Sequence, residues 1–322
     1  MSFENIKGQS SAVDFLKSSI ENDRVSHAYM FIGPSGIGKK LTAVNFAKAL
    51  NCLSPKHSGP CDACAQCKKI DASNHPDFAV FSPAKEDSSL SIDKVRALTR
   101  DIGLKPYEGR KKVYIIDSAN SMTQEAQNAL LKTLEEPPSD SVLILIAENV
   151  NAIFSTIQSR VKRVRFFPLA SDEVARILVD NYKLDAKRAQ VLSGISSGEL
   201  GKALKYEKEG FFEKRGRIID SLVSGSFADS DLEGFSKSDL RLALDVMLTW
   251  YRDILIAKAG ACTRAALVNI DKADIIDAEA KKTGFKELNN MISQVISTCS
   301  FLDQNVNPKL AMGVLGLNLM HR

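Results

Sequence analysis

The stretch GPSGIGKK, Gly33 to Lys40, decides the fold of this chain. It follows a short apolar run at residues 28–32 and precedes a segment of helical apolar spacing at 40–50, which predicts a strand, a tight loop and a helix. In such a loop the backbone N–H groups, the helix dipole and a lysine ammonium together attract a phosphate. The order therefore predicts a phosphate-loop fold, whose nucleotide site would use Gly33, Gly36, Gly38 and Lys39.

The same stretch departs from the pattern of a hydrolysing phosphate loop at its last residue. Lys40 stands where a Ser or Thr normally ligates Mg²⁺, the ion that neutralises charge during phosphoryl transfer. Asp117, after the apolar run 112–116, is either the acidic residue of the site or a carboxylate that caps a turn. Its neighbour Ser118 replaces the Glu that would polarise an attacking water. These residues argue against ATP hydrolysis and leave the binding of ATP and Mg²⁺ open.

The bulk composition is that of a globular protein without a dominant charge. Hydrophobic residues make up 44% and charged residues 25% of the 322 residues, which suffices for two or three domains with separate cores. A formal net charge of +4 is too small to indicate a protein whose main work is binding nucleic acid. The N-terminus lacks a signal-peptide pattern, and no run nears the roughly 20 apolar residues of a membrane span, so we expect a cytoplasmic protein.

Strand and helix patterns alternate up to about residue 166, which predicts an α/β domain with a mainly parallel sheet and helices on both faces. Besides 28–32, the strand candidates are Asp77 to Phe81, Lys112 to Ile116, Val142 to Ala147 and Val161 to Phe166. Helical spacing marks 92–102 and 123–134. Ser121 and Gln124 have the spacing of a capping box at the start of the second helix, and the two prolines at 137–138 forbid its continuation.

Beyond residue 168 the strand signal stops and only helical spacing remains. Three short helical segments fit a small domain. The longer region after them fits a bundle, whose last helix has Asn307 as its N-cap and Pro308 at its first position. We therefore expect three domains with the bounds 1–166, 167–209 and 210–322.

Four of the six cysteines gather in one window with the spacing Cys52-x8-Cys61-x2-Cys64-x2-Cys67. Four thiolates close a tetrahedral Zn²⁺ shell, and with no position left open such a site is structural. An iron–sulfur cluster is the alternative, although the Cys-Pro that usually follows such a run is absent. His57 and His75 lie near enough in sequence to replace a cysteine, but loop histidines are more often surface residues.

The segment FSTIQSRVKRVRF, 154–166, places Ser159 and Arg160 just before a basic strand. One interpretation is a solvated surface arginine that shares a patch with the basic residues of 162–165. The other is an arginine finger, a guanidinium that stabilises the charge on the γ-phosphate at another subunit's site. No acidic residue lies beside Arg160 in the sequence.

Taken together, these motifs resemble the clamp-loader branch of the AAA+ ATPases, which includes the gamma and delta-prime subunits of bacterial DNA polymerase III. The resemblance extends over the whole chain and rests on SHAYMFIGPSGIGKK at 26–40, HPDF at 75–78, NALLKTLEEPP at 128–138, the four-cysteine insertion and the Ser159-Arg160 pair. It implies an AAA+ domain, a small helical lid and a third, helical collar domain through which subunits assemble.

Three departures favour the delta-prime type over the gamma/tau type. The motor subunits of the family carry Ser or Thr, Glu and a nucleotide-sensing lid Arg where this chain has Lys40, Ser118 and Gly201. The resemblance then implies a stator that does not hydrolyse ATP by itself, is a component of the DNA polymerase III holoenzyme, and presents Arg160 with Ser159 to an adjacent gamma site. Val161 replaces the Cys that follows this pair in the family.

The partners implied are the gamma/tau and delta subunits and, through the complex, the beta sliding clamp and primed DNA. Two alternatives stay open: an active gamma-type clamp-loader ATPase with an unusual loop, and a zinc-ribbon nucleic-acid binder with a vestigial nucleotide fold. Intrinsic ATPase activity would favour the first, and salt-sensitive DNA binding by the isolated chain would favour the second.

Overall fold

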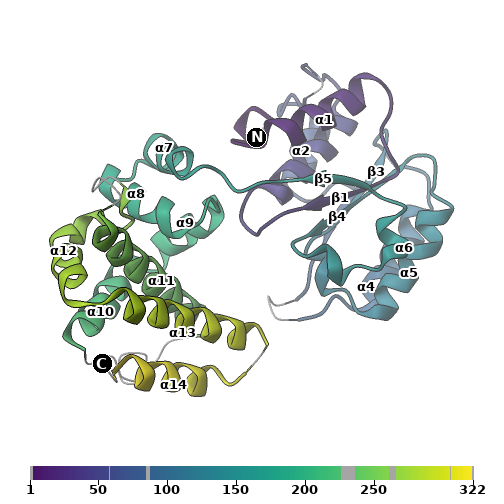
Figure 1. Cartoon of the computed structure of the whole chain (residues 1–322). Coiled ribbons are helices and arrows are strands. Elements are labelled where there is room, and N and C mark those ends of the chain that lie inside the picture. The colour runs from purple at the N-terminus through teal and green to yellow at the C-terminus, as the bar shows by residue number, and fades with distance from the viewer. Residues whose placement is uncertain are drawn as a thin grey trace. The chain divides into compact units, whose positions relative to one another are not determined.

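The computed structural model of the chain describes residues 3–57, 59–84, 88–225, 236–260, 266–304 and 306–320. The chain divides into two compact units, Met1–Leu169 and Ala170–Arg322. The first unit contains the sheet, and the second is built from helices wherever the structure describes it (Figure 1). Each unit is described by itself below.

The first unit is built on a five-stranded sheet in which every pair of neighbouring strands is parallel. The strand order is β2-β3-β4-β1-β5. The strands are β1 Ala28–Ile32, β2 Phe78–Phe81, β3 Lys112–Ile116, β4 Ser141–Ala147 and β5 Lys162–Arg165. The predicted strands and the α/β class of the phosphate-loop domain are therefore confirmed, and three of the strands differ from their predicted bounds by one residue at one or both ends.

Helices cover both faces of the sheet, as Figure 1 shows. On one face, α1 (Ser10–Glu21) and α2 (Lys39–Asn51) pack on alternate residues of the strands, such as Val142 and Ile144 of β4. On the other face, α4 (Ile92–Ile102), α5 (Gln124–Glu135) and α6 (Ser155–Gln158) pack on the residues between them, such as Leu143. Continuous apolar strands are buried on both faces, which is the expected pattern for a parallel sheet. The short elements of this unit are α3 (Ala65–Asp71), η1 (Phe3–Asn5), η2 (Ala119–Ser121) and η3 (Val150–Ala152).

The predicted capping box of α5 is wrong in its residues. Thr123 is the N-cap, and its Oγ1 accepts a hydrogen bond from the backbone N–H of Ala126 at 3.2 Å. Ser121 instead ends η2 and donates from Oγ to the carbonyl oxygen of Ser118 at 2.7 Å. The chain needs this extra turn after β3 before it can enter the helix, and a spacing rule alone does not contain that turn.

In the described part of the second unit the regular elements are all helical. They are α7 Ser171–Tyr182, α8 Ala186–Ile195, α9 Leu200–Lys208, α10 Phe211–Ser224, α11 Lys237–Ala259, η6 Ile270–Lys272, α12 Ala273–Lys282, α13 Phe285–Asp303 and α14 Pro308–Met320. Asn307 caps α14 as predicted, because its Oδ1 accepts a bond from the N–H of Lys309 at 3.1 Å. None of the described helices combines the length and apolar character needed to cross a bilayer.

Candidate functional site: the phosphate loop, the cysteine cluster and Arg160

The phosphate loop joins the end of β1 to the start of α2. Gly36 and Gly38 take positive φ angles of 69° and 95°, which glycine adopts without steric penalty. A Cβ at Gly33 would lie 2.5 Å from the carbonyl oxygen of Phe166, the residue that follows strand β5. Only glycine therefore fits at position 33. These glycines bend the loop around the N-terminus of α2, the position at which helix N–H groups bind phosphate.

Lys39 closes this loop on itself. Its side chain is buried, and Nζ donates hydrogen bonds to the carbonyl oxygens of Gly33, at 2.5 Å, and of Pro34. The ammonium that would contact the terminal phosphates of a nucleotide is thus bonded to the backbone of its own loop. A nucleotide that bound here would have to replace these bonds with phosphate contacts.

Lys40 forms an ion pair with the second acidic element of the site. Its Nζ lies 3.1 Å from Oδ2 of Asp117, with the Lys40 side chain 55% exposed and the Asp117 side chain 23% exposed. Asp117 follows β3 directly, and its N–H donates to the carbonyl oxygen of Phe81 at 2.8 Å. The next residue, Ser118, takes a left-handed conformation with φ 57° at the start of η2. The ammonium of Lys40 therefore lies beside the carboxylate that the sequence offers as the acidic residue of the site.

Arg160 lies just after α6, and its guanidinium is held by three groups. Nη1 donates to the carbonyl oxygen of Thr156 at 2.9 Å, and Nη2 lies 2.9 Å from Oε1 of Glu135. Ser159 contributes its Oγ at 3.3 Å from Nη1. The Arg160 side chain is 36% exposed, so part of it remains open to a partner.

The ion pair of Arg160 with Glu135 was not predicted from the sequence. Glu135 ends α5, and 24 residues of chain, including β4, separate it from Arg160. Only the packing of α5 against α6 brings the two charges together. A usable signal was the NALLKTLEEPP stretch, in which the prolines fix the end of α5 and so the position of Glu135.

Gly201, the residue at the expected position of a lid arginine, lies in the first turn of α9 in the second unit. Its role in the site depends on a contact between the two units and stays a prediction.

The four cysteines come together in the first unit. Their Sγ atoms all lie within 4.8 Å of one another. Cys52 is the C-cap of α2, Cys64 is the N-cap of α3, and Cys67 lies within α3. Backbone N–H groups reach the sulfurs, with Cys61 N 3.3 Å from Cys52 Sγ and Cys64 N 3.3 Å from Cys61 Sγ. Four soft donors at this spacing fit a tetrahedral Zn²⁺ shell.

The cluster divides into two accessible and two buried thiols. Backbone hydrogen bonds, from Ala63 first, lower the pKa of Cys61. Burial opposes ionisation of Cys64, but N–H bonds from Cys67 and Leu53 outweigh it and lower the pKa of Cys64 to about 6. Burial raises the pKa of Cys52 and of Cys67. A metal would therefore have to displace protons from the two buried thiols, which makes its affinity depend on pH.

The two nearby histidines lie outside this cluster, which among the described residues consists of the four cysteines. His57 is exposed. His75 is buried, contrary to the expectation of a surface histidine. Its Nδ1 accepts a bond from the N–H of Asp77 at 3.0 Å and its Nε2 faces Oε1 of Gln66, while burial lowers its pKa. The imidazole is therefore neutral and fully hydrogen-bonded, a structural group.

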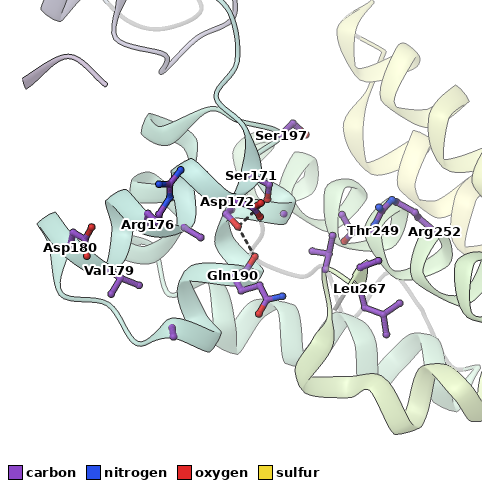
Figure 2. A pocket seen from close by; sticks show the side chains of 16 residues that line it. Ser171, Asp172, Arg176, Val179, Asp180, Gln190, Ser197, Thr249, Arg252 and Leu267 are labelled. Atoms are coloured by element: carbon purple, nitrogen blue, oxygen red, sulfur yellow. Dashed lines mark hydrogen bonds between the residues drawn. The ribbon is translucent and has the colours of Figure 1, made fainter. Parts of the chain in front are cut away.

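A further pocket of about 770 Å³ lies within the second unit, and no residue of it was predicted from the sequence (Figure 2). Helix α7 contributes Asp172, Arg176 and Asp180, and α11 contributes Arg252. Two arginines and two aspartates in one open pocket favour neither an anion nor a cation, so we assign no ligand to it.

Comparisons with known proteins agree with the resemblance of the motifs. The family model "DNA polymerase III, delta subunit" matches residues 8–170, and the model of the C-terminal part of that subunit matches residues 210–319. A Bacillus subtilis protein named DNA polymerase III subunit delta' is 31% identical over 97% of this chain and 96% of its own length. A Pseudomonas aeruginosa protein of the same name is 33% identical over 71% of this chain and 72% of its own. The solved structure of a gamma-subunit-related protein from Thermotoga maritima covers 97% of this chain and 99% of its own, with 20% identity and a TM-score of 0.45.

Proposed function

This chain belongs to the DNA polymerase III delta-subunit family, and on that premise we propose that it is the delta-prime subunit of a clamp loader. In this proposal it acts as a stator: it does not hydrolyse ATP, and it supplies Arg160 to the ATP site of an adjacent gamma subunit. The complex would load the beta sliding clamp onto primed DNA. Replication of chromosomal DNA implies a cytoplasmic location. The observation that carries the proposal is the ion pair of Lys40 with Asp117.

That ion pair supports the loss of hydrolysis in two ways. Phosphoryl transfer at a phosphate loop needs Mg²⁺, held by a loop hydroxyl and an acidic residue. Here Lys40 replaces the residue with the hydroxyl, and its Nζ lies 3.1 Å from Oδ2 of Asp117, the acidic residue. A divalent cation would have to displace the ammonium and would then lie beside its positive charge. The general base is missing as well. Ser118 stands at the position of the Glu that would polarise the attacking water, and a serine cannot act as that base.

Arg160 has the properties that an arginine finger needs. A guanidinium stays charged and offers its N–H groups in a planar fork that matches phosphate oxygens. In this chain both terminal nitrogens of the fork are engaged, Nη1 by Thr156 and Nη2 by Glu135, while the side chain is 36% exposed. The proposal requires that this exposed part face a neighbouring subunit.

The remaining predicted features belong to the same proposal. We propose structural Zn²⁺ at Cys52, Cys61, Cys64 and Cys67, since four thiolates leave no open coordination position. We also propose the three domains 1–166, 167–209 and 210–322, the last for assembly with gamma/tau and delta. An apolar groove of about 370 Å³ between α13 and α14 supports that role, since Phe301, Leu310 and Val314 line it and are exposed.

The substitution Arg160→Ala tests the proposal in a complex reconstituted with gamma and delta subunits. We expect the clamp- and DNA-stimulated ATPase of the adjacent gamma site to fall by on the order of 10³-fold, the contribution of an arginine finger. Assembly, measured by size-exclusion chromatography, should survive. Arg163→Ala is the matched control, because Arg163 lies on the neighbouring strand β5, bonds to Gln158 and should leave the rate unchanged.

Two results would reject the proposal. An unchanged ATPase with Arg160→Ala would return Arg160 to an ordinary surface arginine. Turnover of ATP by the isolated chain, abolished by Lys39→Ala, would instead support the alternative of an active gamma-type ATPase.

A further inference from the structure

A fully buried lysine lies close to the cysteine cluster. Lys48 is in the last turns of α2, and its side chain has 0% exposure. Its Nζ bonds to Oδ1 of Asp62 at 2.5 Å and lies 3.0 Å from Oδ1 of Asp71. Lysine is almost never fully buried unless it is paired, so this position needs a reason. Hydrophobic residues would fill the same space without the desolvation of a charge.

The three residues connect every piece of chain that carries a cysteine of the cluster. Lys48 precedes Cys52 on α2 by about one helical turn. Asp62 lies between Cys61 and Cys64 in the loop, and Asp71 is the last residue of α3, which carries Cys67. One ammonium therefore joins the helix that ends at the first ligand to both ends of the segment that holds the other three. We call Lys48, Asp62 and Asp71 the clasp.

The clasp holds a buried ammonium between two carboxylates. Burial alone would lower the pKa of Lys48, but the hydrogen bonds to Asp62 and Asp71 outweigh it and raise that pKa above its usual value. Asp62 also holds a left-handed backbone with φ 57°, a conformation that Asp tolerates better than most residues. The clasp thus fixes the backbone of the loop between two cysteines.

We propose that the clasp positions the four thiols for their metal, so that Lys48 and Asp62 control how tightly and how long the ion is held without ligating it. The proposal rests on the structural zinc site proposed above. Gathering four thiolates requires the loop to be ordered and their mutual repulsion to be overcome, and the clasp supplies the ordering from groups that are not ligands. Residues that orient metal ligands in this way typically change metal affinity 10- to 100-fold when removed.

A second ion pair of the same segment provides the control. Lys69 in α3 bonds to both carboxylate oxygens of Glu108, at 2.7 and 2.6 Å. This pair ties α3 to the loop before β3. Glu108 also bonds to the stretch between the cysteines through its backbone, whose carbonyl oxygen accepts from Nε2 of Gln66 at 3.2 Å, and Lys69→Met leaves that bond in place. Removal of this ion pair should loosen the attachment of α3 as a whole and leave the conformation of the loop between Cys61 and Cys64 unchanged.

The test compares Lys48→Met, Asp62→Asn and Lys69→Met in the full-length, zinc-loaded protein. We expect transfer of zinc to excess 4-(2-pyridylazo)resorcinol to be about tenfold faster in the first two variants, and within about twofold of wild type in Lys69→Met. In reduced, metal-free protein, alkylation of Cys52 and Cys67 should be faster in the same two variants. Circular dichroism checks that each variant is folded.

The outcomes separate this proposal from the zinc proposal. Wild-type rates of zinc transfer and alkylation in folded Lys48→Met and Asp62→Asn would overturn the clasp, as would equal acceleration in Lys69→Met. If Lys48→Met does not fold, Asp62→Asn decides, since Asp62 is 28% exposed. If metal analysis finds no zinc in the purified protein, the zinc proposal fails, and the alkylation rates still decide whether the clasp holds the thiols.

Discussion

Helix α2 begins at the phosphate loop and ends at the cysteine cluster, and a lysine forms an ion pair near each end. At the first end, Lys40 is 55% exposed and pairs with Asp117 at 3.1 Å. At the other end, Lys48 has 0% exposure and pairs with Asp62 at 2.5 Å. Lys40 stands where a phosphate loop normally carries a magnesium ligand, whereas Lys48 lies behind four cysteines that could hold a metal ion. Under the proposals above, the same residue type removes the conditions for one metal site and supports another.

The surroundings of the two lysines decide what each ion pair is worth. Exposed pairs contribute about 0.2–1 kcal/mol, because water screens them and long side chains lose entropy. Removing one partner of a buried pair costs about 3–5 kcal/mol, because the other charge is left without compensation. The cysteine end of α2 should therefore dominate the stability of the first unit, and the loop end should be tolerant of change.

The largest expected effect is the loss of the metal. Cys67→Ser replaces a buried ligand within α3 and should abolish zinc retention. We expect the free energy of unfolding to fall by roughly 3–5 kcal/mol, a part of the 10–16 kcal/mol of apparent zinc affinity in zinc-finger peptides, because the hydrophobic clusters of the sheet persist. Elemental analysis of the purified protein and denaturant unfolding measure the two quantities.

Cys299→Ser is the control for Cys67→Ser. Cys299 lies on α13 in the second unit, outside the cluster. The Cys299→Ser variant should keep one equivalent of zinc and the free energy of unfolding of the wild type. Equal metal content in the two variants would mean that the four cysteines do not form the site.

The sequence was sufficient for the elements whose pattern is local. Strand β1 and strand β3 begin and end where they were predicted, because apolar runs that are buried on both faces have few competing structures. Helix α4 was also predicted at its observed bounds. The capping box of α5 failed, because η2 lies between β3 and α5 and moves the cap to Thr123.

The candidate sites also combine features that a local sequence pattern reveals with contacts that only the fold creates. The substitution at Lys40 and the spacing of the cysteines could be seen in the sequence, because both belong to local motifs. The ion pairs could not, since Asp117 is 77 residues from Lys40 and Glu135 is 25 residues from Arg160. Those pairs follow from the parallel strand order and the packing of helices on the sheet. The sequence does not distinguish Lys48 from an exposed helical lysine, because its burial follows only from the packing of the folded chain.

The next effect concerns the loop end of α2. Lys40→Thr removes the ammonium beside Asp117 and restores a hydroxyl that can ligate Mg²⁺. We expect affinity for Mg²⁺-ATP to rise at least tenfold, about 1.4 kcal/mol, in isothermal titration calorimetry. Hydrolysis should stay absent, because Ser118 cannot act as a base.

Two further variants serve as controls for this result. One is Lys40→Met, and the other is the double variant that combines Lys40→Thr with Ser118→Glu. The methionine variant removes the charge without supplying a ligand and should gain less affinity than Lys40→Thr. The double variant should gain measurable ATPase. If the wild-type chain already binds Mg²⁺-ATP as tightly as Lys40→Thr, then the ion pair with Asp117 does not block the site.

The smallest expected effect is the coupling energy of Lys40 with Asp117 itself. A double-mutant cycle with Lys40→Met and Asp117→Asn should give about 0.5 kcal/mol in denaturant unfolding, the value typical of an exposed pair. It should shrink in 1 M NaCl, where the Debye length is about 3 Å. The equivalent cycle with Lys48→Met and Asp62→Asn should give a larger energy that salt changes little, because Lys48 is buried. Equal and equally salt-sensitive couplings would mean that burial does not distinguish the two ends of α2.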